Sequence, residues 1–207
     1  MTRRPRTDLL IATKNQGKVR ELSELLAGIP LRLRGLAEFP AVPTAEETGA
    51  TFEENAELKA RFYAAHTGLL TLADDSGLEV EALGGAPGVH SARYAGDSAT
   101  DGERVSRLLR ELRGAGDSAR RARFVCAVAL FVPPAGACEI FLGTCEGRIG
   151  HEPRGANGFG YDPVFLPRGY DQTFAQLPGQ IKQRISHRAQ ALAAARAYLA
   201  EAFPTQP

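Results

Sequence analysis

The order of hydrophobic and polar positions predicts a chain in which strands alternate with helices. Apolar runs with the length of strands stand at 8–13, 31–36, 69–73, 122–132 and 137–148, and the last two are expected to pair as a hairpin. Apolar residues that recur every three or four positions predict amphipathic helices over about 19–26, 52–66, 101–112 and 186–203.

Two adjacent carboxylates follow the strand predicted at 69–73. Asp-Asp-Ser-Gly at 74–77 is expected to end that strand. Neighbouring strand residues point to opposite faces, so Asp74 and Asp75 cannot both enter one site by regular geometry. A carboxylate at the end of a buried strand, with a hydroxyl and a glycine beside it, suits a hard cation and phosphate chemistry. The alternative is a polar turn, because these residue types are common in turns.

A polar loop follows the first predicted strand and precedes a helix. This arrangement presents backbone N–H groups to a phosphate, and Asn15 or Thr13 can cap the helix. The loop is not a Walker A motif, because Ala12 stands where the first glycine belongs and Val19 where Ser or Thr should hold the metal. It can still cradle a phosphate with cations at 14 and 18, or it can be an ordinary connection.

Lysines are rare in this chain. Only Lys14, Lys18, Lys59 and Lys182 occur among 25 basic residues. A guanidinium does not replace a compact ammonium at every site, and all four lysines fall inside or beside the motifs described here. We interpret them as functional; the alternative is that they remain by chance.

The helix predicted over 52–66 is preceded by two acids. Thr51 and Glu54 form the pattern of a capping box at its start. Glu46 and Glu47 lie just before it. They can be solvated acids that the helix dipole stabilises, or they can supply a second metal ligand beside Asp75, and the sequence leaves both open.

A glycine-rich segment at 154–167 combines aromatic and acidic residues. Its glycines let the backbone approach a ligand closely. Phe159 and Tyr161 offer flat faces on which a base can stack, and Asp162 offers a polar contact. The alternative is a glycine-rich turn with core aromatic residues.

The last predicted helix begins with two basic residues. Ser186 can cap it, which places His187 and Arg188 in its first turn. Cations there oppose the helix dipole. An anion or a base carbonyl bound between these side chains and the N–H groups would offset that conflict.

Composition argues against nucleic-acid binding and against a membrane-spanning segment. The 207 residues suffice for a sizeable core, and the net charge of +1 lacks the basic excess typical of nucleic-acid binding. No apolar stretch is long enough to span a membrane. The three cysteines include no C-x-x-C pair, so we expect reduced thiols in a cytoplasmic protein with no nucleic-acid or membrane partner.

Six segments together resemble the inosine/xanthosine triphosphate pyrophosphatases, which remove deaminated purine nucleotides. The resemblance covers nearly the whole chain. It rests on TKNQGKVREL (13–22), EETGATFEENAELKAR (46–61), LADDSGLEVEALGGAPGVHSARYAG (72–96), ARFVCAV (122–128), PRGANGFGYDPVF (153–165) and ISHRAQAL (185–192). Gln180 and Ile181 depart from the acids that the family often has before its last lysine, and Asn157 replaces a common glycine.

The resemblance implies an elongated, two-lobed α/β fold around a long mixed β-sheet with a central substrate cleft. The whole of 1–207 is then one domain whose lobes are not separable. The implied reaction hydrolyses ITP, dITP and XTP to the monophosphate and pyrophosphate. The implied cofactor is Mg²⁺, and the implied assembly is a homodimer.

The resemblance also assigns roles to individual residues. Asp75 becomes the general base and a metal contact, and Glu46 or Glu47 a further metal contact. The proposed substrate contacts are Thr13, Lys14, Asn15, Gln16, Gly17 and Lys18 for the triphosphate, aided by Lys59, then Ser76, and Phe159, Gly160, Tyr161, Asp162, Lys182, His187 and Arg188 around the base.

Two other functions fit parts of the pattern. A pyrophosphatase for other unusual nucleotides, such as the septum-inhibitor-like enzymes, has the same architecture, but the SHR and FGYD segments argue against it. A non-catalytic nucleotide-binding or RNA-binding module is the second, and the near-neutral charge argues against RNA.

Overall fold

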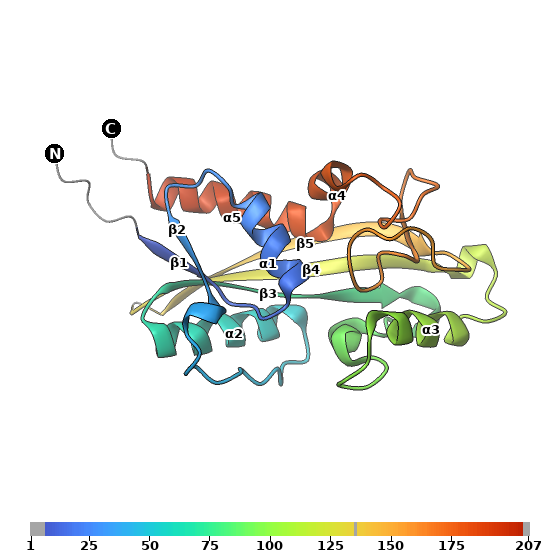
Figure 1. The fold of residues 1–207 in the computed structure, drawn as a ribbon, viewed down its shortest axis with the longest axis horizontal. Helices are drawn as coiled ribbons and strands as arrows, with labels where there is room; N and C mark the ends of the chain where they lie inside the picture. The colour runs from blue at the N-terminus through green and yellow to red at the C-terminus, as the bar shows by residue number, and fades with distance from the viewer. Residues whose placement is uncertain (1–6, 135, 205–207) are drawn as a thin grey trace. The chain divides into compact units, whose positions relative to one another are not determined.

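The computed structural model describes residues 7–134 and 136–204. Its strands are β1 (Asp8–Ile11), β2 (Arg32–Gly35), β3 (Leu70–Val80), β4 (Arg121–Val132), β5 (Ala137–Ile149) and β6 (Phe165–Pro167). Its α-helices are α1 (Gln16–Leu25), α2 (Phe52–Thr67), α3 (Asp101–Glu111), α4 (Gly179–Ile185) and α5 (His187–Ala202). Figure 1 shows this arrangement, and every strand and helix that the sequence predicts is present.

The six strands form one mixed sheet in the order β2-β1-β3-β4-β5-β6. Strand β1 runs parallel to both β2 and β3, whereas β5 and β6 are antiparallel. The predicted α/β class and mixed sheet are therefore confirmed. Strands β4 and β5 are neighbours, as predicted, and the turn expected between them includes residue 135, which lies outside the described residues.

The chain divides into two compact units. The first takes its described residues from 1–75, 127–142 and 191–207, and the second from 76–126 and 143–190. Strands β3, β4 and β5 contribute residues to both. The predicted elongated shape, the lobes and the cleft stay predictions, and so does the single domain.

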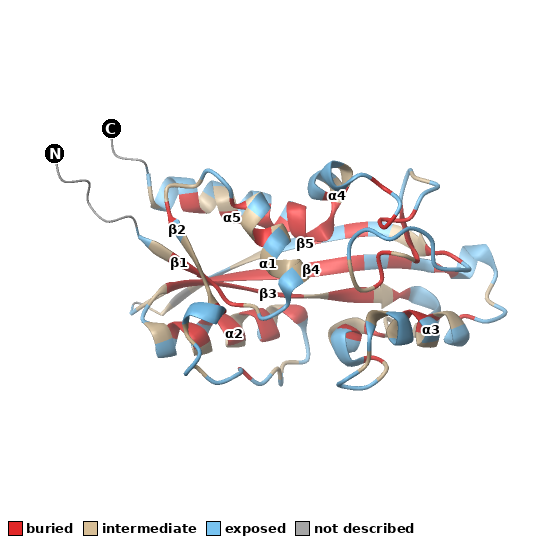
Figure 2. Ribbon diagram, viewed as in Figure 1, coloured by how far each residue is buried: buried red, intermediate tan, exposed pale blue. Residues whose placement is uncertain are grey.

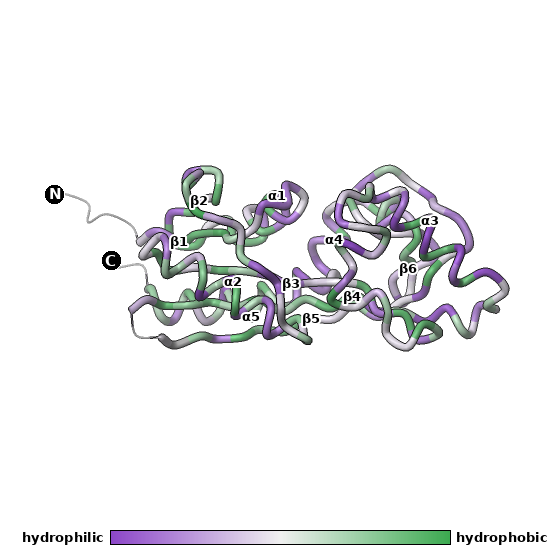
Figure 3. The backbone as a smooth tube through the Cα atoms, turned by 90° about the horizontal axis from the view of Figure 1, so that it is seen from below, coloured by the Kyte–Doolittle hydropathy of each residue, from purple (hydrophilic) through white to green (hydrophobic). Residues whose placement is uncertain are grey.

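Strands of the first unit are covered by helices on two sides. Helices α1 and α5 lie on one side of the strands and α2 on the other (Figure 1). Helix α1 is mostly hydrophilic in Figure 3, and Leu22 is its one fully buried residue. Its end is fixed by Arg196 of α5, whose guanidinium donates to the carbonyls of Leu25 and Ala27. These contacts hold the C-terminal end of α1 against α5.

The second unit has an aromatic core. Phe165 stacks against Phe174 with ring centroids 5.3 Å apart, and Phe124 lies 4.6 Å from Phe165. Helix α3 adds Val105 and Leu108 to this core. Thr100 and Glu103 form the capping box that the pattern T-x-x-E predicts for α3.

Burial follows the strands. Figure 2 shows buried residues concentrated in β3 and β4 and on single faces of the helices. Among the described residues, no helix combines the length and the apolar character that crossing a membrane requires.

Two local predictions need correction, and one short helix was not predicted. Strand β3 does not end at 74–77 but continues to Val80, because Leu78 and Val80 are buried and keep the chain extended. Lys182 lies in a separate short helix, α4, which was not predicted.

The second correction concerns the start of α2. The Glu54 carboxylate accepts from the N–H of Ala50 rather than from the cap residue Thr51, so the predicted capping box is only half formed.

Candidate functional site

The loop between β1 and α1 ends in a capped helix start. The Asn15 side chain accepts from the Lys18 N–H at 3.1 Å, and the Thr13 hydroxyl accepts from the Asn15 N–H at 3.2 Å. Asn15 is therefore the cap. Gln16 and Gly17 open the helix, so their N–H groups lie at its positive end, where an anion is stabilised.

Two lysines flank this helix start. Lys18 forms an ion pair with Asp74, with Nζ 2.9 Å from Oδ2, and the Asp74 side chain is fully buried. Lys14 is exposed, and its ammonium donates to the Thr44 hydroxyl at 2.7 Å. The loop thus combines backbone donors with two cations, of which only one is tied to an acid by the contacts seen here.

Asp75 of strand β3 pairs with Lys59 of α2. The Lys59 Nζ lies 2.9 Å from Asp75 Oδ1 and 3.0 Å from Glu47 Oε1. We call these three residues the Asp75 cluster. Asp74 meets Lys18 of α1 and Asp75 meets Lys59 of α2, and the two helices lie on opposite sides of the strands (Figure 1). The predicted alternation of the two carboxylates is therefore confirmed.

The position of Glu47 depends on contacts at both ends of its segment. The Ala45 N–H donates to the Tyr63 hydroxyl, and the Gly49 N–H donates to the Asn55 side chain at 2.8 Å. Both acceptors belong to α2. A Cβ on Gly49 would lie 2.8 Å from the Asn55 Oδ1 atom, so a side chain there would displace the segment. Helix α2 therefore holds Glu47 beside its own Lys59.

Burial and neighbouring charges determine the electrostatics of the Asp75 cluster. Burial raises the pKa of Asp75, although the Lys59 and Lys18 ammonium groups oppose the rise. Burial alone would lower the pKa of Lys59, but the carboxylates of Asp75, Asp74 and Glu47 outweigh it and raise the pKa. Lys59 therefore stays charged, and Asp75 is a better proton acceptor than an exposed aspartate.

The carboxylates of the Asp75 cluster are suited to bind a hard cation. The Asp75 Oδ2 atom is buried and has no hydrogen-bond partner within the described residues, whereas buried polar atoms are normally paired. Within that same part of the chain no group of three or more His, Cys, Asp or Glu residues can hold a metal. Mg²⁺ usually takes only one or two carboxylates, with waters and substrate phosphates as its other ligands. Asp75 and Glu47 therefore fit Mg²⁺ bound together with a phosphate.

In the second unit, the glycine-rich segment forms a tight loop at 158–162. The Asp162 carboxylate accepts from the Phe159 N–H at 2.9 Å and pairs with the Lys182 ammonium. A Cβ on Gly158 would lie 2.0 Å from that carboxylate, so glycine is required. The Tyr161 ring is buried, and its hydroxyl donates to the Ser91 carbonyl. Burial raises the pKa of that phenol. Phe159 is thus the more accessible aromatic ring.

Cations gather around the Phe159 ring. The Lys182 Nζ lies 4.8 Å from the ring centroid, and the Arg188 guanidinium carbon lies 5.7 Å from it. Arg188 also donates to the Ser76 hydroxyl at 2.8 Å. Ser186 caps α5 as predicted, and His187 stacks on Phe124 with centroids 4.7 Å apart.

The structure brings most of the predicted site residues into two groups. The first unit holds the 13–18 loop and the Asp75 cluster, and the second holds the 158–162 loop with Ser76, Lys182, His187 and Arg188. Glu46 belongs to neither, because it is exposed and no ion pair or hydrogen bond of its carboxylate is seen within the described residues. Asp74 and Asn55 support the first group, but they were not predicted as site residues. The burial of both, despite their polarity, was not evident from the sequence.

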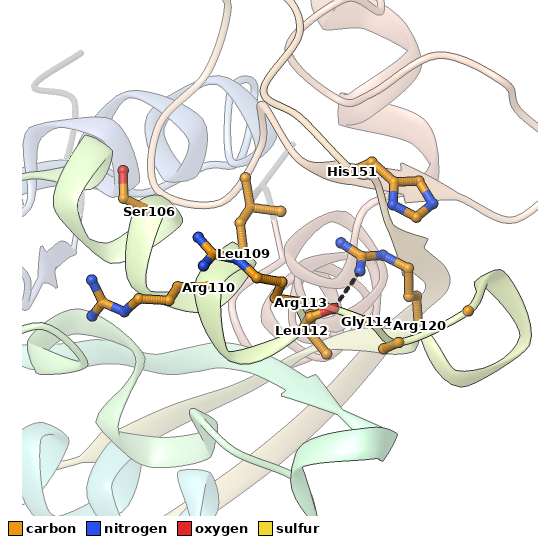
Figure 4. Close-up of a pocket in the computed structure, with 10 residues that line it drawn as sticks. Ser106, Leu109, Arg110, Leu112, Arg113, Gly114, Arg120 and His151 are labelled. Atoms are coloured by element: carbon orange, nitrogen blue, oxygen red, sulfur yellow. Dashed lines mark hydrogen bonds between the residues drawn. The ribbon is translucent and has the colours of Figure 1, made fainter.

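A pocket of about 620 Å³ lies elsewhere in the second unit, at the end of α3 (Figure 4). Arg110, Arg113, Arg120 and His151 line it. The Arg120 guanidinium donates to the carbonyls of Leu112, Ile149 and Gly150, so it joins the helix end to the chain after β5. None of the predicted site residues lines this pocket.

Comparison with known proteins assigns this chain to a family. The sequence model of the Ham1 family matches 9–198. The chain belongs to the Ham1 family. A Bacillus licheniformis protein named dITP/XTP pyrophosphatase is 48% identical over 195 residues, which cover 94% of this chain and 99% of that protein. This membership confirms the resemblance inferred from the six sequence segments.

Solved structures of Ham1 proteins share the fold. A HAM1 protein from Coxiella burnetii is 47% identical and superposes with a TM-score of 0.86, covering 94% of this chain and 99% of that one. The Staphylococcus aureus Ham1 protein is 40% identical, with a TM-score of 0.84 over 95% of this chain and all of its own. The α/β architecture is therefore that of the Ham1 family over nearly the whole chain.

Proposed function

We propose that this protein hydrolyses ITP, dITP and XTP to the nucleoside monophosphate and pyrophosphate. The observation that carries the proposal is the buried Asp75 carboxylate, which has one oxygen bonded to Lys59 and the other without a hydrogen-bond partner in the described residues. The name of the relatives, dITP/XTP pyrophosphatase, supports the same reaction.

The triphosphate binds at the start of α1. Gln16 and Gly17 offer backbone N–H groups at the helix N-terminus, and Lys14 and Lys18 add positive charge. Each contact neutralises part of the charge on the phosphate oxygens. Phosphoryl transfer needs mainly such neutralisation and alignment.

Asp75 accepts the proton from the attacking water. Water adds across the α–β anhydride: one P–O bond forms to the water oxygen, the bridging P–O bond breaks, and the pyrophosphate leaves. Lys59 fixes the Asp75 side chain through Oδ1, so that Oδ2 is directed to the reaction. A positioned base of this kind contributes typically about 10²–10⁴-fold to the rate.

Asp75 and Glu47 would hold Mg²⁺ together with the substrate phosphates, and the exposed Glu46 would not be a ligand. When bound, the ion spreads the negative charge that develops on the leaving pyrophosphate. Glu47 is chosen over Glu46 because its carboxylate already lies in the Asp75 cluster.

The 158–162 loop and its neighbours bind the base. Phe159 stacks on the purine, and donors among Lys182, His187 and Arg188 bond the 6-keto oxygen of hypoxanthine or xanthine. Adenine presents an amino group there and leaves a donor unpaired. An unpaired buried donor costs roughly 1–3 kcal/mol, which lowers affinity about 5- to 150-fold.

Assembly and location complete the proposal. The protein acts as a homodimer in the cytoplasm and has no nucleic-acid partner. The net charge of +1 supports the last point, and the family resemblance supports the dimer.

Product analysis tests the reaction. The full-length protein is incubated with dITP and Mg²⁺, and the products are separated by anion-exchange chromatography. The proposal expects dIMP and pyrophosphate in equal amounts from the first time points. Formation of dIDP and phosphate would place the cleavage at the other anhydride and contradict it.

A further inference from the structure

The 158–162 loop is held by a residue that belongs to neither group of predicted site residues. The Gly160 N–H donates to the Asp101 Oδ2 atom at 2.7 Å. Asp101 is the first residue of α3 and stands 59 positions earlier in the chain. A carboxylate that accepts a backbone N–H makes a charge-assisted bond, which is stronger than a bond between neutral groups.

Three consecutive loop residues have three different anchors. Phe159 donates its N–H to Asp162, Gly160 donates to Asp101, and the Tyr161 hydroxyl donates to the Ser91 carbonyl. Gly160 has a φ of +62°, a conformation that favours glycine. Within the described residues, the Asp101 bond is therefore the long-range anchor of the residue directly after Phe159.

The Asp101 carboxylate is itself fixed. Its other oxygen pairs with the Arg104 guanidinium, which also donates to the Ala92 carbonyl at 2.9 Å and to the Ala99 carbonyl. The Arg104 side chain is only 16% exposed. The Asp101 side chain is 46% exposed, yet each of its carboxylate oxygens has a partner of its own, Gly160 or Arg104.

We propose that Asp101 is a positioning residue for base recognition: by holding Gly160, it sets the place of the Phe159 ring. The Lys182 ammonium lies 4.8 Å from the centroid of that ring, so the same bond also sets the position of the ring relative to this cation. Asp101 acts through the loop and does not touch the substrate. This inference rests on the proposed function, because it assigns the purine to the 158–162 loop.

Loss of Asp101 is expected to weaken the binding of the base and not that of the phosphates. The phosphates bind at the 13–18 loop, whose contacts are with residues of its own unit. Removal of one charge-assisted bond is expected to weaken binding of the base about 10-fold. Binding of a ligand that has no base should not change.

The test compares three ligands on the full-length protein by calorimetry: dIMP, dAMP and inorganic tripolyphosphate. The variants are Asp101→Ala and Asp101→Asn, and Asp97→Ala is the control because Asp97 is an exposed loop acid close to α3. Asp101→Ala is expected to bind dIMP about 10-fold more weakly and tripolyphosphate as the wild type does. Asp101→Asn is expected to restore dIMP binding in part, because its amide oxygen can still accept from Gly160, although it lacks the charge and the second acceptor that Arg104 uses.

Two results would overturn the inference directly. One is unchanged dIMP binding in Asp101→Ala. The other is an equal loss of dIMP and tripolyphosphate binding, which would indicate general damage to the fold. If Asp101→Ala does not fold, Asp101→Glu replaces it: the charge stays, the carboxylate moves by one methylene, and the same selective loss is expected.

The wild type separates this inference from the proposed function. If it binds dIMP no better than dAMP, the inference is wrong. Pyrophosphate release from dITP and from dATP, measured on the same preparation, then shows whether the proposed function fails as well. Selective release from dITP would leave that function intact, with base recognition placed elsewhere.

Discussion

Lys59 and Asp75 form a buried ion pair, with the ammonium nitrogen 2.9 Å from Oδ1 and both side chains less than a tenth exposed. The pair joins the middle of α2 to the middle of β3. Because Lys59 also reaches Glu47, one ammonium fixes both carboxylates that we assign to the metal and to the proton transfer.

Replacement of the proposed base removes turnover. Asp75→Asn keeps the shape of the side chain but cannot accept the proton, so kcat for dITP is expected to fall at least about 100-fold. Circular dichroism should show that the fold is retained. Asp171→Asn is the control, because its side chain is fully exposed, and it should leave kcat unchanged. Near-normal turnover in Asp75→Asn would remove Asp75 from the mechanism.

The two adjacent glutamates are expected to differ in their effect on metal binding. Glu47→Gln loses a carboxylate of the Asp75 cluster, so the Mg²⁺ concentration for half-maximal activity should rise about 10-fold or more. Glu46 is exposed, and Glu46→Gln should change that concentration by less than about 2-fold. Titration of both variants with MgCl₂ at saturating dITP gives the comparison, and the reverse order would reassign the metal to Glu46.

Removal of Lys59 should destabilise the fold in a pH-dependent way. In Lys59→Met the Asp75 carboxylate stays buried without its cation, which costs about 3 kcal/mol of unfolding free energy at pH 8. The pKa of Asp75, already raised by burial, rises further when Lys59 is gone. The neutral form of a group with a raised folded-state pKa stabilises the fold at low pH, and this contribution is lost as the pH rises through that pKa.

Urea unfolding at pH 5 and pH 8 measures this effect. The deficit of Lys59→Met relative to the wild type should be larger at pH 8. Arg121→Met serves as the control, because its ion pair with Glu81 is exposed, and it should leave the unfolding free energy close to that of the wild type at both pH values. An equal deficit at both pH values would show that Asp75 does not take up the proton.

Gly49 is expected to be required for the position of Glu47. A Cβ at this residue would lie 2.7 Å from the Glu54 Cβ and 2.8 Å from the Asn55 Oδ1, so Gly49→Ala must displace the segment, at about 1–3 kcal/mol. The Mg²⁺ requirement should rise with it. Gly35→Ala is the matched control, since a Cβ there meets nothing within 4 Å. Identical metal titrations for the two variants would contradict the account.

The local rules of the sequence were enough for much of the fold. Alternation along a strand predicted that Asp74 and Asp75 face opposite sides, and they meet Lys18 and Lys59 respectively. Turn propensity failed at Ser76 and Gly77, because the burial of Leu78 outweighed it and the strand continued. Tertiary packing therefore decided the length of β3.

Partners distant in the sequence were beyond the reach of pattern analysis. Lys59 was singled out by its rarity, yet its bonds to Glu47 and Asp75 depend on how α2 packs against β3. The bond from Gly160 to Asp101 has no sequence signal, because an acid in the first turn of a helix is common. Such contacts became visible only in the folded chain.

Pyrophosphate release from dITP, XTP, GTP and ATP, with and without Mg²⁺, is the decisive measurement of the proposed reaction. Metal-dependent release is predicted from dITP and XTP, about a hundredfold faster than from ATP, whose amino group leaves a donor of the base site unpaired. Equal release from all four nucleotides would make the protein a general nucleotide pyrophosphatase, and release without added metal would contradict the role assigned to Asp75 and Glu47.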